Sequence, residues 1–266
     1  MKNNKQLQEQ ATAAFAQLVE IIRKLRSPGG CPWDQEQTAS TLKPFIIEEA
    51  YEVIDAIDSK DDDAISEELG DLLLQVMLQS QIAAEKGAFD IADVVKGLSK
   101  KMIHRHPHVF KSTKVKDSDE VLKNWEQLKK KEKTRRSLFD GIPSQLPGLL
   151  KAARMGEKAS RVGFDWPKAQ MVRDKITEEL AELDEAVEHG DPGHIKHELG
   201  DLLFAVAQWA RHLDQPPEEA MRACCTRFSQ RFSKVEATVK ANGQEISDCN
   251  LKTLEAIWQE IKKDES

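Results

Sequence analysis

The same pattern of acidic residues occurs twice in this chain, at an offset of 130 residues (Glu49 to Glu179). Each copy reads Glu-Glu-x-x-Glu and, after fifteen further residues, Glu-x-x-Asp. Residues three or four apart lie on one face of a helix. Each copy therefore predicts two neighbouring helices that direct four carboxylates towards one point. The two sets are Glu49, Glu52, Glu68 and Asp71, and Glu179, Glu182, Glu198 and Asp201.

Four carboxylates at one point repel each other unless a cation lies among them. A hard divalent ion is the expected occupant, Mg²⁺ above all, with Mn²⁺ as the alternative. Leu180 and Val187 belong to an apolar stripe beside Glu179, which predicts that the carboxylates lie at a hydrophobic boundary. The second cluster has no compensating cation of its own, so activity should require the metal. A single glutamate would be interpreted as a solvated helix residue, but the repeated spacing favours a metal site.

The composition favours long amphipathic helices. Charged residues make up 32% of the 266 residues, against 13 glycines and a single tyrosine. No apolar stretch approaches the roughly 18–20 residues of a membrane span, and the N-terminus lacks a signal-peptide core. The four cysteines form no CxxC pair, and the net charge of −7 argues against nucleic-acid binding. We therefore expect a cytoplasmic protein with neither a membrane partner nor a nucleic-acid partner.

Turn-rich sequence separates the two acidic copies. The segment SLFDGIPSQLP contains one glycine and two prolines, which interrupt helices. We expect an N-terminal domain over residues 1–136, a linker over 137–147 and a C-terminal domain over 148–266. A single repetition at this offset indicates a duplicated domain and not a solenoid.

Four further motifs accompany the acidic copies: GCPWD at 30–34, RHPHVF at 105–110, GIPSQLPGL at 141–149 and VGFDW at 162–166. With them the chain resembles, over nearly its whole length, the MazG family of tandem nucleoside triphosphate pyrophosphohydrolases. The resemblance implies an all-α fold of two tandem MazG-like helical domains, each with a four-helix bundle that carries paired acidic helices and Mg²⁺. It also implies a homodimer that hydrolyses nucleoside triphosphates to the monophosphate and pyrophosphate.

The resemblance also assigns nucleotide contacts in the second half of the chain. The positions that match are Lys175, Arg227, Arg231, Trp258 and Lys262. Cationic side chains suit phosphate oxygens, and a tryptophan can stack on a base. Without the resemblance, the cations would be interpreted as solvated residues and the tryptophan as a core residue. No Asn or Gln pair near the second motif stands out as a reader of base edges, so we expect a broad range of ribo- and deoxyribonucleoside triphosphates.

The first copy lacks part of this set. Phe45 stands where the second copy has Lys175, and a phenylalanine cannot bind phosphate, although Lys101 and Arg105 are partial counterparts of the arginine pair. The family pattern also assigns activity mainly to the C-terminal domain. We therefore expect the second cluster to be the main catalytic site and the first to be degenerate or differently selective.

Other interpretations use the same residues. Buried glutamates on four helices also hold di-iron centres, but these need Glu-x-x-His motifs, which this sequence lacks. A nuclease, or a triphosphatase that releases orthophosphate, would use the same metal chemistry. A non-enzymatic helical module that regulates a partner would carry the acidic residues on solvated faces. Identifying the released product separates these interpretations, because a triphosphatase releases orthophosphate and a non-enzymatic module releases no product.

Overall fold

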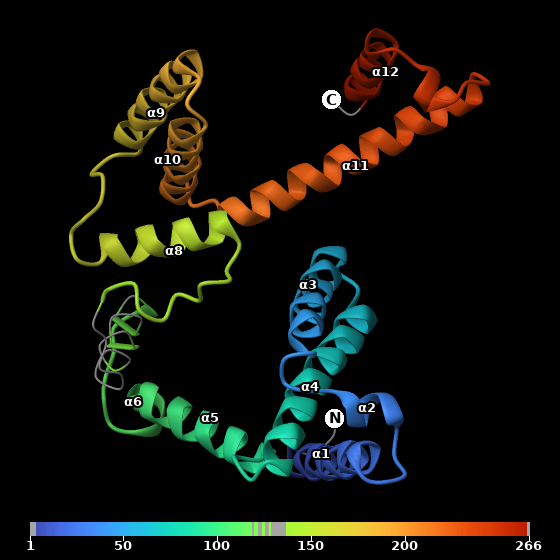
Figure 1. The fold of residues 1–266 in the computed structure, drawn as a ribbon. Coiled ribbons are helices and arrows are strands. Elements are labelled where there is room, and N and C mark those ends of the chain that lie inside the picture. Colours follow the sequence, from blue (N-terminus) through green and yellow to red (C-terminus); the bar gives the residue numbers. More distant parts are fainter. Residues whose placement is uncertain (1–3, 119, 122–123, 126–127, 129–136, 265–266) are drawn as a thin grey trace. The chain divides into compact units, whose positions relative to one another are not determined.

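A computed structural model describes residues 4–264 except 119, 122–123, 126–127 and 129–136 (Figure 1). The described residues form α-helices and one short 3-10 helix, and no strand occurs among them. None of the described helices is both long enough and apolar enough to cross a membrane. The helices favoured by the composition, and the all-α fold implied by the family resemblance, are confirmed for this part of the chain.

The chain divides into two compact units, Met1–Lys133 and Thr134–Ser266. The first contains α1 (Asn4–Arg26), α2 (Pro32–Glu36), α3 (Lys43–Ser59), α4 (Asp62–Glu85), α5 (Ile91–Arg105) and α6 (Pro107–Phe110). The second contains α8 (Gly148–Ser160), α9 (Ala169–His189), α10 (Pro192–His212), α11 (Pro217–Ala241), η1 (Ile246–Asp248) and α12 (Leu251–Asp264). Residues 137–147 form turns and bends. The domain limits set out above stay a prediction, because residues 129–136 lie outside the described residues.

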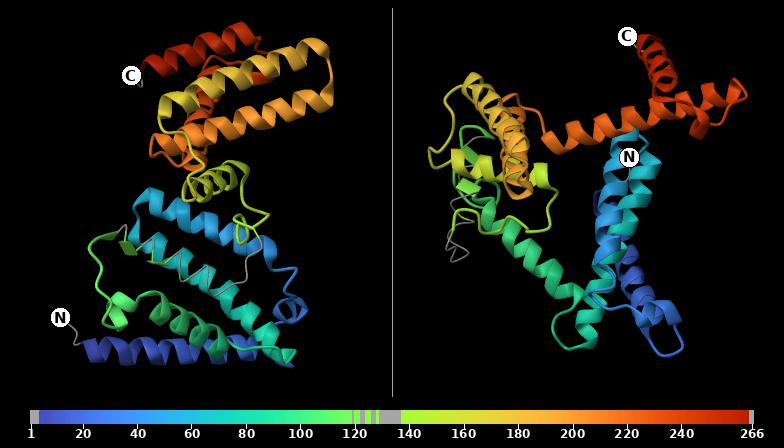
Figure 2. Two further views of the ribbon diagram at one scale, coloured as in Figure 1. Left: turned by 90° about the vertical axis from the view of Figure 1, so that its left-hand side faces the viewer. Right: turned by 45° about the horizontal axis from the view of Figure 1, so that its top comes forward.

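Each acidic copy folds into a helical hairpin, α3 with α4 and α9 with α10 (Figure 2). The turns of the two hairpins are alike. Lys60 and Gly190 end the first helix of each in the left-handed region, with φ of 59° and 72°. Asp61 and Asp191 follow as N-caps, and their carboxylates accept hydrogen bonds from backbone amides in the first turn of α4 and α10. Because the connection is this short, the acidic residues of both helices are brought to the same side of the hairpin.

The core of the first unit lies between α1 and α4. Its buried members are Ile22, Leu42, Met77, Leu78 and Ile82. Phe45 packs against this cluster at the start of α3 and meets Trp33 edge to face, with 6.0 Å between the ring centroids. The residue that replaces the lysine of the second copy is therefore a packing residue.

In the second unit α8 packs against α10, and the contact depends on a glycine. Gly156 and Gln208 are both buried, and a Cβ atom at Gly156 would overlap the Gln208 amide. The Gln208 amide donates to the Ala152 carbonyl over 2.8 Å and accepts from Arg211 Nε over 3.1 Å. A glycine at 156 therefore leaves room for a buried amide that joins the two helices.

The loop between α8 and α9 is attached to the end of α10. Asp165, in the VGFDW motif, accepts hydrogen bonds from Arg211 at 2.9 Å and from His212 at 3.0 Å. Burial opposes ionisation of Asp165, but the hydrogen bonds from Arg211 and His212 outweigh it and lower the pKa of the carboxyl. This motif therefore holds the chain at the entry to α9.

The apolar stripe predicted for α9 is only partly buried. The buried residues of α9 are Val172, Glu179 and Ala186, seven residues apart. Leu180 and Val187, which were expected to face inward, are exposed. Ala186 and Ala205 are buried on α9 and α10, and small side chains let two helices approach closely. Leu180 and Val187 are consequently left on the outer face of the hairpin.

The last helices extend away from the acidic hairpin. Among the described helices, α9 packs on α10 only, and α12 packs on α11 only apart from its neighbouring turn. α11 itself contacts α8, α10 and α12, and Figure 2 shows α12 folded back along its far end. Within one chain, the acidic hairpin therefore provides two helices, not four, around the carboxylates.

Candidate metal and nucleotide site

The second acidic cluster lies between α9 and α10. Carboxylate oxygens of Glu179, Glu182 and Glu198 come within 4.8 Å of one another. Glu179 and Glu198 are only 6% and 7% exposed, which is unusual for glutamates. All four predicted acidic residues, including Asp201, line one cavity of about 370 Å³. The structure therefore brings the whole second set together, as the spacing predicted.

A lysine already lies in this cavity, which corrects the expectation that the cluster has no compensating cation. Lys175 Nζ is 2.8 Å from Glu179 Oε1 and 2.8 Å from Glu178 Oε1. Hydrogen bonds to Glu178 and to Glu179 raise the pKa of Lys175, so its charge is firmly held. The i,i+4 spacing of Lys175 and Glu179 explains the contact, because the two residues share a face of α9.

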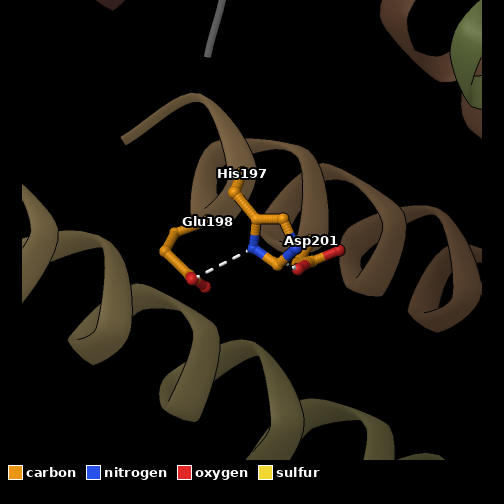
Figure 3. Close-up of side chains that lie close together, drawn as sticks. All are labelled: His197, Glu198 and Asp201. Atoms are coloured by element: carbon orange, nitrogen blue, oxygen red, sulfur yellow. Dashed lines mark hydrogen bonds and ion pairs between the residues drawn. The ribbon is translucent and has the colours of Figure 1, made fainter. Parts of the chain in front are cut away.

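Two histidines of α10 complete the surroundings and were missed at the sequence level. His194 Nε2 lies 3.0 Å from Glu198 Oε1. His197 Nδ1 lies 3.1 Å from the same oxygen and 3.2 Å from Asp201 Oδ2, between the two carboxylates (Figure 3). The sequence HIKHELGD indicates two of these contacts. His194 lies four residues before Glu198, and His197 lies four residues before Asp201, so each pair shares a helix face.

The charges in the cavity are still unbalanced. Burial raises the pKa of the Glu182 carboxyl, and the negative charge of Glu179 raises it further. A hydrogen bond to Glu198 and the charge of Asp201 raise the pKa of His197. Clustered oxygen donors, partly buried and crowded by like charge, are the donor set that a divalent cation prefers. The residues present therefore fit a bound divalent metal ion.

The first acidic cluster is similar but has different neighbours. Glu49, Glu52 and Glu68 have oxygens within 4.8 Å of one another. Burial and the charges of nearby carboxylates, Asp71 among them, raise the pKa of Glu49 and of Glu68. Gln75 Nε2 donates to Glu49 over 3.3 Å. This hairpin contains no histidine, and its position equivalent to Lys175 is an apolar packing residue.

The predicted nucleotide contacts divide into two groups. Lys175 reaches the second cluster, as described above. Arg227 and Arg231 lie on α11, and Trp258 and Lys262 lie on α12. The Trp258 ring lies 5.1 Å from that of Phe228, and the Arg231 guanidinium lies 6.0 Å from the Trp258 centroid. None of these four residues lines the acidic cavity of its own chain.

The sequence of each hairpin also matches a family model. The model of the MazG nucleotide pyrophosphohydrolase domain matches residues 37–110 and 168–235, which together make up more than half of the chain. This chain belongs to the MazG family. Each match covers one acidic hairpin completely, so the tandem arrangement of two MazG helical domains expected from the sequence is confirmed.

Two MazG relatives are similar over nearly the whole chain. The nucleoside triphosphate pyrophosphohydrolase/pyrophosphatase MazG of Thermotoga maritima is 44% identical over 256 residues, 96% of this chain and 98% of the relative. The nucleoside triphosphate pyrophosphohydrolase of Escherichia coli K12 is 42% identical over 254 residues, 93% of this chain and 97% of the relative. The crystal structure of a mazG-related protein from Thermotoga maritima, 31% identical, covers 43% of this chain and 98% of its own, with a TM-score of 0.38.

Proposed function

We propose that this MazG protein hydrolyses nucleoside triphosphates to the nucleoside monophosphate and pyrophosphate, with Mg²⁺ held at the second acidic cluster. The observation that carries the proposal is the buried carboxylate cluster of α9 and α10, which has a lysine in the same cavity and lies inside a matched MazG domain. The names of the relatives support the same reaction class.

The acidic residues act by holding and orienting the metal. Glu179, Glu182, Glu198 and Asp201 are its proposed ligands, with Mn²⁺ as an alternative to Mg²⁺. A divalent cation supplies charge neutralisation for the phosphates and polarises a water molecule. Lys175 pairs with Glu179, and we assign it to a phosphate oxygen of the bound nucleotide.

The second cluster, not the first, is the proposed main catalytic site. Transfer at a phosphorus atom depends on positioning and on stabilisation of phosphate charge, so a cation beside the metal is needed. Lys175 supplies that cation in the second hairpin, whereas Phe45 occupies the equivalent position in the first and packs in the core. The first cluster retains the geometry of a metal site without this part of the catalytic apparatus.

The remaining nucleotide contacts are assigned to a second copy of the chain. Trp258 and Lys262 lie on α12, which does not contact the acidic hairpin of its own chain. The outer face of α10 carries an exposed apolar stripe, Leu199, Leu203 and Val206, that repeats Leu69, Leu73 and Val76 of α4. A homodimer that pairs these hairpins would surround the carboxylates with four helices and could bring α11 and α12 to the partner's site.

A broad base range follows from the proposed contacts. Trp258 offers a ring face on which any base can stack, and the other assigned residues bind phosphate. Affinity should therefore come mainly from the triphosphate and the metal, with little discrimination between bases or between ribose and deoxyribose.

The test is product identification on the eight common ribo- and deoxyribonucleoside triphosphates, each with Mg²⁺ and with excess EDTA. We expect pyrophosphate and the monophosphate from most of the panel, and no turnover with EDTA because the ligands need the metal. Release of orthophosphate would indicate a triphosphatase, and full turnover in EDTA would contradict the metal site. One substrate favoured by more than about a thousandfold, roughly 4 kcal/mol, would indicate a base-reading pocket.

A further inference from the structure

The two acidic hairpins differ in their histidines. At the offset of 130 residues, His194 and His197 of the second hairpin correspond to Ala64 and Glu67 of the first, while the neighbouring Glu-x-x-Asp ligands are retained. Both histidines lie against the acidic cluster of α10. The proposed catalytic hairpin is thus the one in which imidazole nitrogen is placed among the carboxylates.

The donor atoms around His197 are spaced as neighbouring metal ligands would be. Its Nδ1 atom is 3.1 Å from Glu198 Oε1 and 3.2 Å from Asp201 Oδ2 (Figure 3). Adjacent ligands of an octahedral ion at 2.0–2.1 Å lie about 3 Å apart, because their bonds meet at a right angle. The three residues also satisfy the spacing of a metal-binding group by themselves, and Glu198 is shared with Glu179 and Glu182.

We propose that the second MazG site is a mixed nitrogen and oxygen site, in which His197 is a metal ligand beside the carboxylates of Glu198 and Asp201. His194 is a positioning residue, whose Nε2 atom holds the Glu198 oxygen from the other side. Binding requires the imidazole nitrogen in its neutral form, so the proton on it passes to solvent when the metal is bound.

This assignment has a consequence for the choice of metal. Carboxylate and water ligands suit Mg²⁺ and Mn²⁺, whereas imidazole suits the later first-row metals, whose affinities rise from Mn²⁺ through Co²⁺. His197 should therefore shift the second site towards Co²⁺ and away from Mg²⁺, relative to the carboxylate site of the first hairpin. The inference rests on the metal site of the proposed function and adds the identity of one ligand.

The test uses the full-length protein with Glu49→Gln and Glu68→Gln, which remove two ligands of the first cluster so that the second is the site observed. Three versions are compared in this background: both histidines intact, His197→Glu, and His194→Ala. His197→Glu carries the residue of the first hairpin and keeps an oxygen donor, and His194→Ala is the matched control on the same face of α10. Each is loaded with Mn²⁺ without nucleotide and measured by pulsed EPR, which detects nitrogen bound to the ion.

We expect nitrogen coupling with the histidines intact and in His194→Ala, and none in His197→Glu. Competition between Co²⁺ and Mg²⁺ should show the affinity ratio falling by about tenfold in His197→Glu, in favour of Mg²⁺. The assignment would be overturned if the intact version showed no nitrogen coupling, or if the coupling survived His197→Glu or was lost in His194→Ala. An unchanged ratio of Co²⁺ to Mg²⁺ affinity in His197→Glu would overturn it as well.

A measurement of Mn²⁺ binding separates an error about His197 from an error about the metal site as a whole. If the background binds no Mn²⁺, or if its Mn²⁺ binding survives a further Glu198→Gln, the second cluster is not a metal site and the proposed function fails together with the inference. If Mn²⁺ binds through Glu198 but shows no nitrogen, the proposed function stands and only the role of His197 is overturned.

Discussion

The carboxyl of Glu182 lies where its ionisation is unfavourable. Burial and the charge of Glu179 raise its pKa, as burial and neighbouring charges do for Glu49 and Glu68 in the first cluster. A carboxyl whose pKa is raised in the folded state binds its proton more tightly there than in the unfolded chain. Its contribution to stability is therefore present below the ordinary pKa and is lost as pH rises through the raised pKa. A bound divalent cation removes this penalty.

This charge crowding predicts how metal and pH act together on stability. Mg²⁺ should raise the Tm by more at about pH 7.5 than at about pH 5, because the raised pKa of Glu182 lets protons compete with the metal at the lower pH. Thermal unfolding with and without Mg²⁺ at the two pH values measures the difference. Glu198→Gln is the control, because it removes a ligand and should reduce the Mg²⁺ effect at both. An equal Mg²⁺ shift at both pH values would contradict the account.

For individual residues of the site, the sequence predicts which carboxylates meet, but not which cationic side chains lie beside them. The spacing of Glu179, Glu182, Glu198 and Asp201 was enough, since helical periodicity decides what shares a face. Lys175 was assigned to phosphate alone, and the structure shows that it also pairs with Glu179. The contact of His197 with Asp201 follows the same i,i+4 rule, but its contact with Glu198 does not, because adjacent residues ordinarily point in different directions on a helix.

Among the helices, the buried side of α9 could not be derived from apolar periodicity. Leu180 and Val187 are exposed, whereas Ile176 and Leu183 are half-buried, and the fully buried line includes a glutamate. A periodic apolar stripe marks a face that will be covered, but it does not say by which neighbour. The turn between α9 and α10 depends instead on local chemistry, because Gly190 ends one helix in the left-handed region and Asp191 caps the next.

The contact of α8 with α10 provides a test at the level of one helix pair. Gly156→Ala should destabilise the protein by about 1–3 kcal/mol, because the added methyl group overlaps the buried amide of Gln208 and displaces its hydrogen bond to Ala152. Chemical denaturation measures this. Gly97→Ala is the control, since a Cβ atom there meets no described atom within 4 Å in α5 and should leave stability equal or slightly higher. Equal effects of the two substitutions would contradict the packing role of Gly156.

For the whole molecule, the exposed apolar stripes of α4 and α10 need a covering partner. We expect a homodimer of about 60 kDa, twice the 30.0 kDa of one chain. Light scattering at micromolar concentration measures the mass, and a value of about 30 kDa would contradict the pairing. Leu203→Glu places a charge in the stripe of α10 and should weaken the dimer, whereas Leu213→Glu, exposed beyond the end of α10, should leave it intact.

If the second MazG hairpin carries the pyrophosphohydrolase site, matched substitutions in the two hairpins should have very different effects. Glu198→Gln and Glu68→Gln make the same change at equivalent positions of the two clusters, with nearly the same shape and one charge fewer. The rate of pyrophosphate release from a nucleoside triphosphate in Mg²⁺ is measured for both. The account predicts a loss of about a hundredfold or more for Glu198→Gln and a rate close to that of the unaltered protein for Glu68→Gln. A greater loss for Glu68→Gln would contradict the assignment.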